Sequence, residues 1–320
     1  MKNKAIINNL WIDNDNMEEV MYQKTKDTEL IKYTKLIVKD GFIRLEKALK
    51  SFECDAIIED FDSYCSTFKD ESDSHTLKTG LHSRLCNFHL TSINASSAIV
   101  IEKIMKLLDF WFDDEAAVCT SLFFEQSTEQ AIHRDSPFFC TEPYGLFFGV
   151  WFALEDIKLE AGPLNYYPGL HKDFIDRYEI GKLIGSDGRP YEEYIKRLNE
   201  ICSKSGIEKK VALIKKGDAF IWHPELPHGG GPITTPGKTR KSIVFHCIPK
   251  TKSVYGVDEF FGHKPYDGRT HSLKSMNKLK RINSWNHFLK KIFKKKKNSE
   301  ILNSGRFMID HGEPKFDVNF

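Results

Sequence analysis

Two separate stretches of the chain share a residue pattern that limits strongly what it can fold into. In residues 117–170 and again in 209–249, short apolar runs alternate with Gly, Pro and Asp, as in "YGLFFGVWFALED" and "KGDAFIWHPELPHGGG". Short strands separated by regular turn signals are typical of a β-sandwich or a β-barrel. We therefore expect a mainly β core assembled from both stretches.

Helices are expected before and between these stretches. Residues 1–30 are polar and lack a clear period, which predicts a loose N-terminal arm, and β-branched residues around a glycine predict a strand in 36–49. Two later segments have apolar residues on one helical face behind a serine cap. They are "SFECDAIIEDF", capped by Ser51 with Cys54, Ile57, Ile58 and Phe61 on the face, and "SSAIVIEKIMKLLDFWF", with Ile101, Ile104, Leu108 and Trp111. A helical insert is expected at about 172–205.

Charge and cysteine usage narrow the class of protein. The 320 residues carry a formal net charge of only +2, so no overall field favours nucleic acid as a partner. The seven cysteines are scattered, and none forms a C-x-x-C pair, which is typical of reduced cysteines in a cytoplasmic protein. The first residues do not resemble a signal peptide, and no apolar run is long enough to span a membrane.

The segment 271–298 is strongly basic and contains no acidic residue. Leu279, Ile282, Trp285 and Leu289 recur at helical spacing, which predicts a basic amphipathic helix within a C-terminal tail, 271–320. Three interpretations stay open. The helix packs on the β core, it contacts an anionic membrane surface through 274–297, or it binds RNA or a phosphorylated or nucleotide-linked substrate.

The stretch "QAIHRDSPFF" (130–139) predicts a metal site. If it is a strand, residues two apart share a face, so His133 and Asp135 project together and Arg134 points away. The third ligand is then a histidine from a distant strand, and we favour His228 in "LPHGGG" over His223 in "IWHPEL". Two histidines and one carboxylate with open positions suit non-haem Fe(II).

These blocks, in this order, resemble the phytanoyl-CoA dioxygenase family of Fe(II)/2-oxoglutarate-dependent oxygenases. The resemblance spans about residues 38–250 and includes "EQAIHRDSPFF", "GVWFALEDIKLEAGPLNYYPGLHK" and "KGDAFIWHPELPHGGG". It implies a double-stranded β-helix core, the jelly roll of cupin-like proteins, flanked by helices. The catalytic domain would cover 31–270, and its cofactors would be Fe(II), 2-oxoglutarate and O2.

The resemblance also implies roles for single residues. His133, Asp135 and His228 would bind iron, and Arg240 would pair with the distal carboxylate of 2-oxoglutarate, which a guanidinium meets bidentately. Ser242 would add a hydrogen bond to that carboxylate, and Trp151 would lie near the co-substrate. Where many members carry a lysine, this chain has "FFEQSTEQ", so Gln130 or Gln126 is the candidate for the other end of 2-oxoglutarate.

The expected reaction is hydroxylation of an unactivated C–H bond, with release of succinate and CO2. Related halogenases have a small residue at the position of Asp135, so the carboxylate favours hydroxylation. No catalytic residue is expected beyond the metal site. The substrate would be a small or carrier-linked organic molecule, and the candidate pocket residues are Phe138, Phe139, Tyr144, Asn165, Tyr166 and His223.

Two other functions are compatible with the same residues. A jelly roll without turnover would bind a glycan or a phosphorylated ligand. A metal-dependent cupin enzyme would use His223 as a ligand and would need no 2-oxoglutarate. A requirement for Arg240 separates the oxygenase from the cupin enzyme. The sequence does not indicate an oligomeric state.

Overall fold

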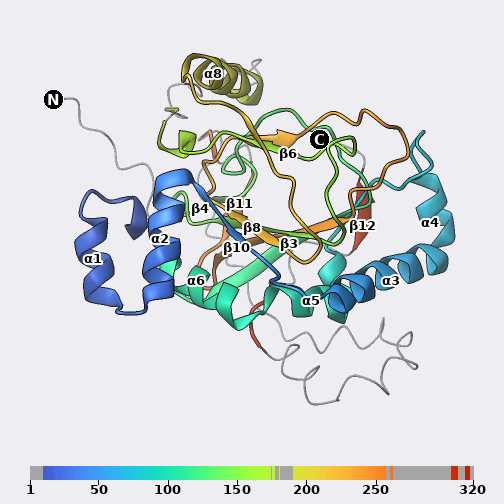
Figure 1. Cartoon of the computed structure of the whole chain (residues 1–320), viewed down its shortest axis with the longest axis horizontal. Helices are drawn as coiled ribbons and strands as arrows, with labels where there is room; N and C mark the ends of the chain where they lie inside the picture. Colours follow the sequence, from blue (N-terminus) through green and yellow to red (C-terminus); the bar gives the residue numbers. More distant parts are fainter. Residues whose placement is uncertain are drawn as a thin grey trace.

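A large antiparallel sheet and a small one form the centre of the molecule (Figure 1). The structure is a computed structural model, and it describes residues 10–173, 175–176, 180, 190–256, 260–261, 304–308 and 314–317. In spatial order, the large sheet consists of β1 (Phe42–Leu45), β8 (Ala219–Trp222), β5 (Phe148–Ala153), β10 (Ser242–Pro249), β3 (Ala116–Phe124), β2 (Arg84–Cys86) and β12 (Lys315–Asp317). The small sheet consists of β7 (Lys210–Val211), β6 (Leu164–Tyr166) and β9 (His228–Gly230), and a two-stranded sheet pairs β11 (Val254–Tyr255) with β4 (Cys140–Thr141).

Strand β10 shows how the large sheet separates a packed face from a functional one. Ile243, Phe245 and Cys247 belong to the main hydrophobic core, together with residues of the helices. Val244 and His246 alternate with them and line a pocket on the opposite face. This alternation follows from the two-residue period of a strand. A single strand therefore contributes both to the stability of the fold and to the wall of a cavity.

Helices cover the core face of the large sheet. In Figure 1, α5 and α6 lie on one side of the sheet, whereas β6 and α8 lie on the other. The described helices are α1 (Met17–Lys24), α2 (Thr28–Asp40), α3 (Ser51–Thr67), α4 (Lys69–Ser74), α5 (Ile93–Ile99), α6 (Glu102–Phe112) and α8 (Pro190–Lys204), with 3-10 turns η1 (Trp11–Asp13), η2 (Phe88–Leu90) and η3 (Leu170–Lys172). None of these helices combines the length and the hydrophobicity needed to cross a bilayer.

The prediction of a loose arm over residues 1–30 is wrong for its described part. Residues 10–30 contain η1, α1 and the start of α2, and Leu10, Ile12 and Met21 are almost fully buried in the main core. These apolar residues are few and widely spaced, so the sequence shows no regular period, and tertiary packing stabilises the segment instead. Residues 1–9 lie outside the described residues.

The prediction of a strand over 36–49 holds only for β1. Residues 36–40 are the last turns of α2, whose Asp27 cap accepts hydrogen bonds from the backbone N–H groups of Glu29 and Leu30. Gly41 ends the helix with a φ of 77°, a left-handed conformation that glycine adopts without strain. The β-branched residues do not prevent a helix here because Ile37 packs fully buried in the core.

The serine caps also differ from the prediction. The segment 96–112 is divided into α5 and α6, and the cap of α5 is Ser92, whose hydroxyl accepts from the Ala95 N–H at 2.9 Å. Helix α3 begins at Ser51, but its first turn is closed by Glu53, which accepts from the Lys50 N–H at 2.8 Å. The predicted apolar faces are retained, since their residues are buried or packed against the core: Cys54, Ile57, Ile58, Phe61, Ile101, Ile104, Leu108 and Trp111.

The structure describes only part of the predicted helical insert, 172–205, and of the predicted C-terminal tail, 271–320. Helix α8 lies within the predicted insert 172–205. The basic segment 271–298 lies outside the described residues, and the three interpretations of it stay open. The prediction of a separate tail over 271–320 needs correction, because β12 pairs with β2 and both Phe307 and Phe316 are buried in the main core.

One buried hydrogen bond joins α2 to α6 and gives a test of this packing. Trp111 donates from Nε1 to Thr34 Oγ1 at 2.9 Å, and both side chains are fully buried. Replacing Thr34 with valine keeps the shape and leaves the indole N–H without an acceptor, so we expect the free energy of unfolding to fall by about 1–3 kcal/mol. Chemical denaturation measures this change. Thr34→Ser, which retains the hydroxyl, is the control, and a valine variant as stable as the wild type would contradict the role of this bond.

Candidate metal centre

His133 and His228 are brought side by side by a single antiparallel bridge. The His133 N–H donates to the His228 carbonyl oxygen at 2.8 Å, and the His228 N–H donates to the His133 carbonyl oxygen at 2.9 Å. The predicted strand over "AIHRD" is wrong, because only His133 has a bridge partner and the chain bends at Asp135. The expected directions are nevertheless found, since His133 and Asp135 face the same pocket while Arg134 does not line it.

Glycines after His228 allow this close approach. A Cβ atom at Gly229 would lie 2.6 Å from the Gln130 carbonyl oxygen, and one at Gly230 would lie 3.0 Å from the Glu129 nitrogen. A larger residue at either position would therefore push the segment before His133 away from β9. These glycines set the position of one ligand segment against the other.

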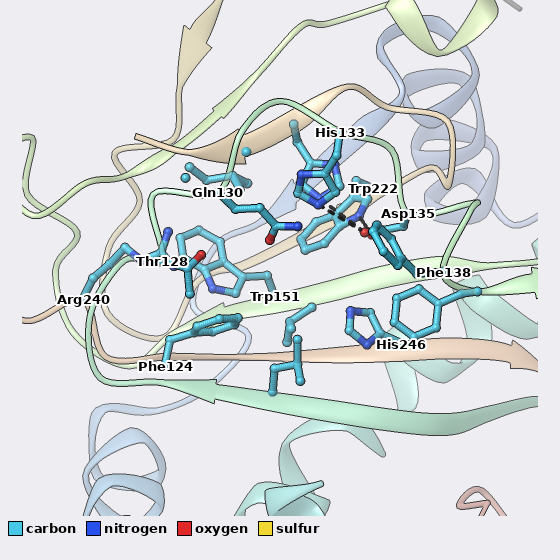
Figure 2. Close-up of a pocket in the computed structure, with 17 residues that line it drawn as sticks. Phe124, Thr128, Gln130, His133, Asp135, Phe138, Trp151, Trp222, Arg240 and His246 are labelled. Atoms are coloured by element: carbon cyan, nitrogen blue, oxygen red, sulfur yellow. Dashed lines mark hydrogen bonds and ion pairs between the residues drawn. The ribbon is translucent and has the colours of Figure 1, made fainter. Parts of the chain in front are cut away.

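The three predicted ligands form a compact, buried cluster (Figure 2). Their ligand atoms all lie within 4.8 Å of one another. Asp135 Oδ1 is 3.6 Å from His133 Nε2 and 3.7 Å from His228 Nε2. Among the described residues, this is the one group of three or more metal-capable side chains with such spacing. The geometry suits a single divalent ion held from one side.

Hydrogen bonds to the far side of each ligand orient it toward the centre. Nδ1 of His133 lies 2.8 Å from the Ala131 carbonyl oxygen, and Nδ1 of His228 lies 2.9 Å from that of Leu226. In each ring Nδ1 therefore carries the proton, and the lone pair of Nε2 is directed at the site. Trp222 Nε1 donates to Asp135 Oδ2 at 2.7 Å, which leaves Oδ1 for a metal. The donor set thus fits a resident cation.

The charge states of the ligands are those that metal binding requires. Burial lowers the pKa of His228 to about 4, so its imidazole is neutral at neutral pH. Burial alone would raise the pKa of Asp135, but His228 and the hydrogen bond with His133 outweigh burial and hold it below its ordinary value. The aspartate is therefore a carboxylate over the physiological range. A neutral imidazole and a carboxylate bind a cation without first losing a proton.

Arg240 occupies the other end of the same pocket, away from the ligand cluster (Figure 2). Its guanidinium is 4% exposed, and burial lowers its pKa to about 10. Nη1 donates to the Gly162 carbonyl oxygen at 3.3 Å, Nε has no partner, and no described carboxylate lies within ion-pair distance. A buried cation without a counter-ion is costly, so this end of the pocket is suited to an anion.

The pocket, counted together with its open mouth, encloses about 630 Å³. Four further predicted residues line it, namely Trp151, Gln130, Phe138 and Phe139. The Trp151 ring lies 5.6 Å from the Arg240 guanidinium, and Gln130 projects between Arg240 and His133 in Figure 2. Gln126 instead accepts a hydrogen bond from Thr79 Oγ1 at 2.8 Å and does not line the pocket.

Five predicted site residues lie outside the pocket lining, which corrects their assignment: Ser242, Tyr144, Asn165, Tyr166 and His223. The Ser242 hydroxyl donates to the Arg240 carbonyl oxygen at 3.1 Å, and Tyr144 hydrogen-bonds to Glu225. His223 Nε2 lies 3.2 Å from Asp13 Oδ2. The partners of Tyr144 and His223 are distant in the sequence, and no local pattern indicates them.

The other two of these five residues, Asn165 and Tyr166, belong to β6 of the small sheet. Asn165 pairs with Gly229 across β6 and β9. Tyr166 packs against Phe42 and Phe220, with ring centroids 4.7 and 5.1 Å apart. Both residues therefore help to hold the sheet that carries His228, without facing the pocket.

Sequence reasoning missed several lining residues, among them Phe124, Thr128, Trp222 and His246. A signal for His246 was present, because it stands six residues after Arg240, an even spacing that places both side chains on one face of a strand. Trp222 needs Gly149 opposite it in β5, since a Cβ atom there would overlap the indole ring. The sequence shows both residues but not their pairing.

Arg134, between two ligands, is part of the support behind the site. It is fully buried and pairs with Glu225, with Nη1 3.3 Å from Oε2. Its Nη2 also donates to the carbonyl oxygens of Leu170 at 3.0 Å and Asp173 at 2.6 Å. The ligand segment is therefore attached to the chain that follows η3.

The hydrogen bond from Trp222 to Asp135 leads to a testable expectation. Trp222→Phe removes the donor and keeps most of the ring, so Asp135 loses the group that orients it. We expect Fe(II) affinity to fall about 10- to 100-fold, the usual effect of losing such a supporting bond. Competition with a metal chelator measures this. Trp11→Phe, at a tryptophan remote from the pocket, is the matched control, and an unchanged affinity in Trp222→Phe would contradict the orienting role.

Known proteins resemble this chain in sequence and in fold. The sequence model of the phytanoyl-CoA dioxygenase (PhyH) family matches residues 37–242, which is more than half of the chain. "Phytanoyl-CoA dioxygenase domain-containing protein 1" of Bos taurus is 43% identical over 137 residues, or 43% of this chain and 45% of that protein. Its Danio rerio counterpart is 31% identical over 128 residues, or 40% and 42% of the two chains. The matched part thus spans less than half of these relatives.

Solved structures share the fold at low sequence identity. The epimerase SnoN, in complex with Fe3+ and alpha ketoglutarate, is 17% identical with a TM-score of 0.55, over 75% of this chain and 92% of that chain. The non-heme alpha ketoglutarate dependent carbocyclase SnoK is 13% identical with a TM-score of 0.56, over 77% and 95% of the two chains. The predicted class of fold, a jelly-roll core with flanking helices, is confirmed.

Proposed function

The chain belongs to the phytanoyl-CoA dioxygenase family, and from this membership we propose that it is a non-haem Fe(II)/2-oxoglutarate-dependent oxygenase. The observation that carries the proposal is the content of one buried pocket. At one end are three oriented metal ligands, and at the other is a buried guanidinium without a counter-ion. A dicarboxylate that chelates a metal through one end and meets a cation at the other would use both features.

The residues of the chain have separate tasks in this proposal. His133, Asp135 and His228 would hold the iron on one side and leave positions open on the other. Arg240 would bind the distal carboxylate, with the apolar rings of Phe124 and Trp151 keeping water from the guanidinium. Bound iron, together with 2-oxoglutarate and O2, would supply the oxidising chemistry, and 2-oxoglutarate would be the source of succinate and CO2. The remaining task of the protein is to hold the substrate with one C–H bond toward the open positions.

Hydroxylation of a small or carrier-linked organic molecule is the form of this reaction that we propose. Asp135 supports it, since the carboxylate occupies the metal position that a halide would need. Phe138 and Phe139 line the pocket on the side of the ligand cluster, and Figure 2 shows Phe138 beside Asp135. An apolar wall next to the metal suits a hydrocarbon portion of the substrate.

The two rival functions have less support. A cupin enzyme with His223 as ligand is disfavoured because that imidazole does not line the pocket and lies next to Asp13. A binding module without turnover would have no need for two imidazoles and a carboxylate directed at one point. The cupin enzyme also gives no task to the buried arginine without a counter-ion in the same cavity.

We also propose a cellular location and a membrane partner. We propose a cytoplasmic protein because all seven cysteines are free in the structure, as expected in a reducing compartment. Contact with an anionic membrane through 274–297 stays a proposal from the basic sequence alone, and that segment lies outside the described residues. Nucleic acid is not proposed as a partner.

Succinate formation tests the proposed function. Protein with Fe(II), 2-oxoglutarate and air should form succinate slowly without added substrate, because uncoupled turnover needs only the cofactors. A chelator should stop the reaction, and restoring Fe(II) should restart it. Absence of succinate from protein that has bound both iron and 2-oxoglutarate would refute the oxygenase assignment.

A further inference from the structure

His246 is a polar side chain in the pocket to which the proposed iron and 2-oxoglutarate sites assign no task. It stands on β10, six residues after Arg240, and lines the pocket on the side of the ligand cluster (Figure 2). The residue is 3% exposed, and its ring lies against Phe139, with centroids 4.1 Å apart, and Phe147, at 5.6 Å. The imidazole is thus held between aromatic rings in a fixed position.

The hydrogen-bonding capacity of this imidazole is unused within the described part of the chain. Nδ1 is buried without a partner, and no hydrogen bond of Nε2 is found among the described residues. The Asp135 carboxylate, which lines the same pocket, has Oδ2 bonded to Trp222 and Oδ1 directed at the two histidine ligands. A buried polar group without a partner costs free energy, so a ring kept in this state at the wall of a cavity is suited to bonding a ligand.

The other lining residues restrict what that ligand can be. Apart from the metal ligands and Arg240, none of the lining residues carries a formal charge at neutral pH. Leu122 and Val244 are paired on adjacent strands, and with Phe138 and Phe139 they make an apolar wall. Among the described residues, an anionic group at this end of the pocket would find no cation besides the metal. The portion of the substrate that enters is therefore neutral and largely apolar.

We propose that His246 orients the primary substrate by a hydrogen bond to a hydroxyl or carbonyl group of a neutral, largely apolar molecule. An imidazole both donates and accepts, so it can serve either group. This inference rests on the proposed function, because it assumes that Arg240 and the ligand cluster are occupied by 2-oxoglutarate and iron. To the proposed function it adds the chemical class of the substrate and the residue that selects that substrate.

A pair of probes of nearly equal shape tests the inference. Benzyl alcohol and toluene differ by one hydroxyl, and each is titrated into anaerobic protein loaded with Fe(II) and 2-oxoglutarate. Binding is followed by the shift of the visible charge-transfer band of the chelate. We expect the wild type to bind benzyl alcohol about 3- to 10-fold more tightly, the effect of one hydrogen bond. His246→Leu should bring the ratio to about one, and His246→Gln should retain part of the preference.

Controls separate this inference from the proposed function. Leu122→Ala changes the apolar wall without removing either ring that packs against His246, so both dissociation constants should change and their ratio should stay as in the wild type. No band in wild-type protein before any probe is added would contradict the proposed function itself. A normal band with equal binding of the two probes, or with no binding of either, would overturn only the role of His246. So would a His246→Leu variant that keeps the wild-type preference or loses the band.

Discussion

Replacing Asp135 with alanine is expected to abolish iron-dependent turnover. The variant keeps two imidazoles but loses the only anionic ligand of the cluster. In the wild type, Oδ1 of Asp135 is the atom that faces both histidines. Loss of a supporting bond alone weakens metal sites about 10- to 100-fold, so loss of a ligand should lower Fe(II) affinity by at least roughly 100-fold. Chelator competition measures the affinity, and succinate formation measures the turnover.

The control for this variant is an aspartate that takes no part in the site. Asp70→Ala, at an exposed position of α4, should leave iron affinity and succinate formation unchanged. Unfolding measurements should show that both variants are folded. An Asp135→Ala protein that oxidises 2-oxoglutarate at the wild-type rate would refute the assignment of the metal ligands.

Replacing Arg240 with glutamine is expected to weaken 2-oxoglutarate binding while iron still binds. Removing one partner of a buried charge pair costs about 2–5 kcal/mol, which corresponds to roughly 30- to several thousand-fold in the dissociation constant of 2-oxoglutarate. The iron ligands lie at the other end of the pocket, so Fe(II) affinity should stay within a few-fold of the wild type. Separate titrations of Fe(II) and 2-oxoglutarate distinguish the two effects.

Arg240→Lys is the matched comparison for this second variant. Lysine keeps the positive charge but lacks the planar pair of donors, so it should recover only part of the lost affinity. Because the apo pocket contains an unpaired buried cation, glutamine should not destabilise the protein without 2-oxoglutarate. Normal succinate formation by Arg240→Gln at limiting 2-oxoglutarate would show that Arg240 does not anchor the distal carboxylate.

Much of this site could be predicted because the spacing of residues along the chain and the chemistry of their side chains both indicated the same metal ligands. His133 and Asp135 stand two residues apart, and even without a continuous strand their side chains converge. His228 was favoured because of the glycines that follow it, and these glycines do allow the close approach of the Gln130 segment. Position along the chain and residue type were sufficient to select three side chains that cluster in one pocket with Arg240.

The features of the site and of the fold that the sequence did not predict depend on contacts between distant segments. Tyr144 and His223 are close in sequence to site residues, but partners from other elements, Glu225 and Asp13, hold them elsewhere. Trp222 reaches Asp135 only because β8 lies beside Gly149 of β5. The same cause explains the errors in the fold, since tertiary burial of Ile37 keeps a β-branched segment helical. Pairings of this kind are not encoded in any single stretch.

The most direct test of the central claim is an anaerobic titration of iron-loaded wild-type protein with 2-oxoglutarate, followed by visible absorption. A single pocket that holds iron at His133, Asp135 and His228 and a carboxylate at Arg240 predicts a saturable charge-transfer band, which Arg240→Gln shifts to higher 2-oxoglutarate concentrations. Protein that binds Fe(II) but develops no band at any concentration of 2-oxoglutarate would show that the two ends of the pocket do not serve one co-substrate, and would contradict the account.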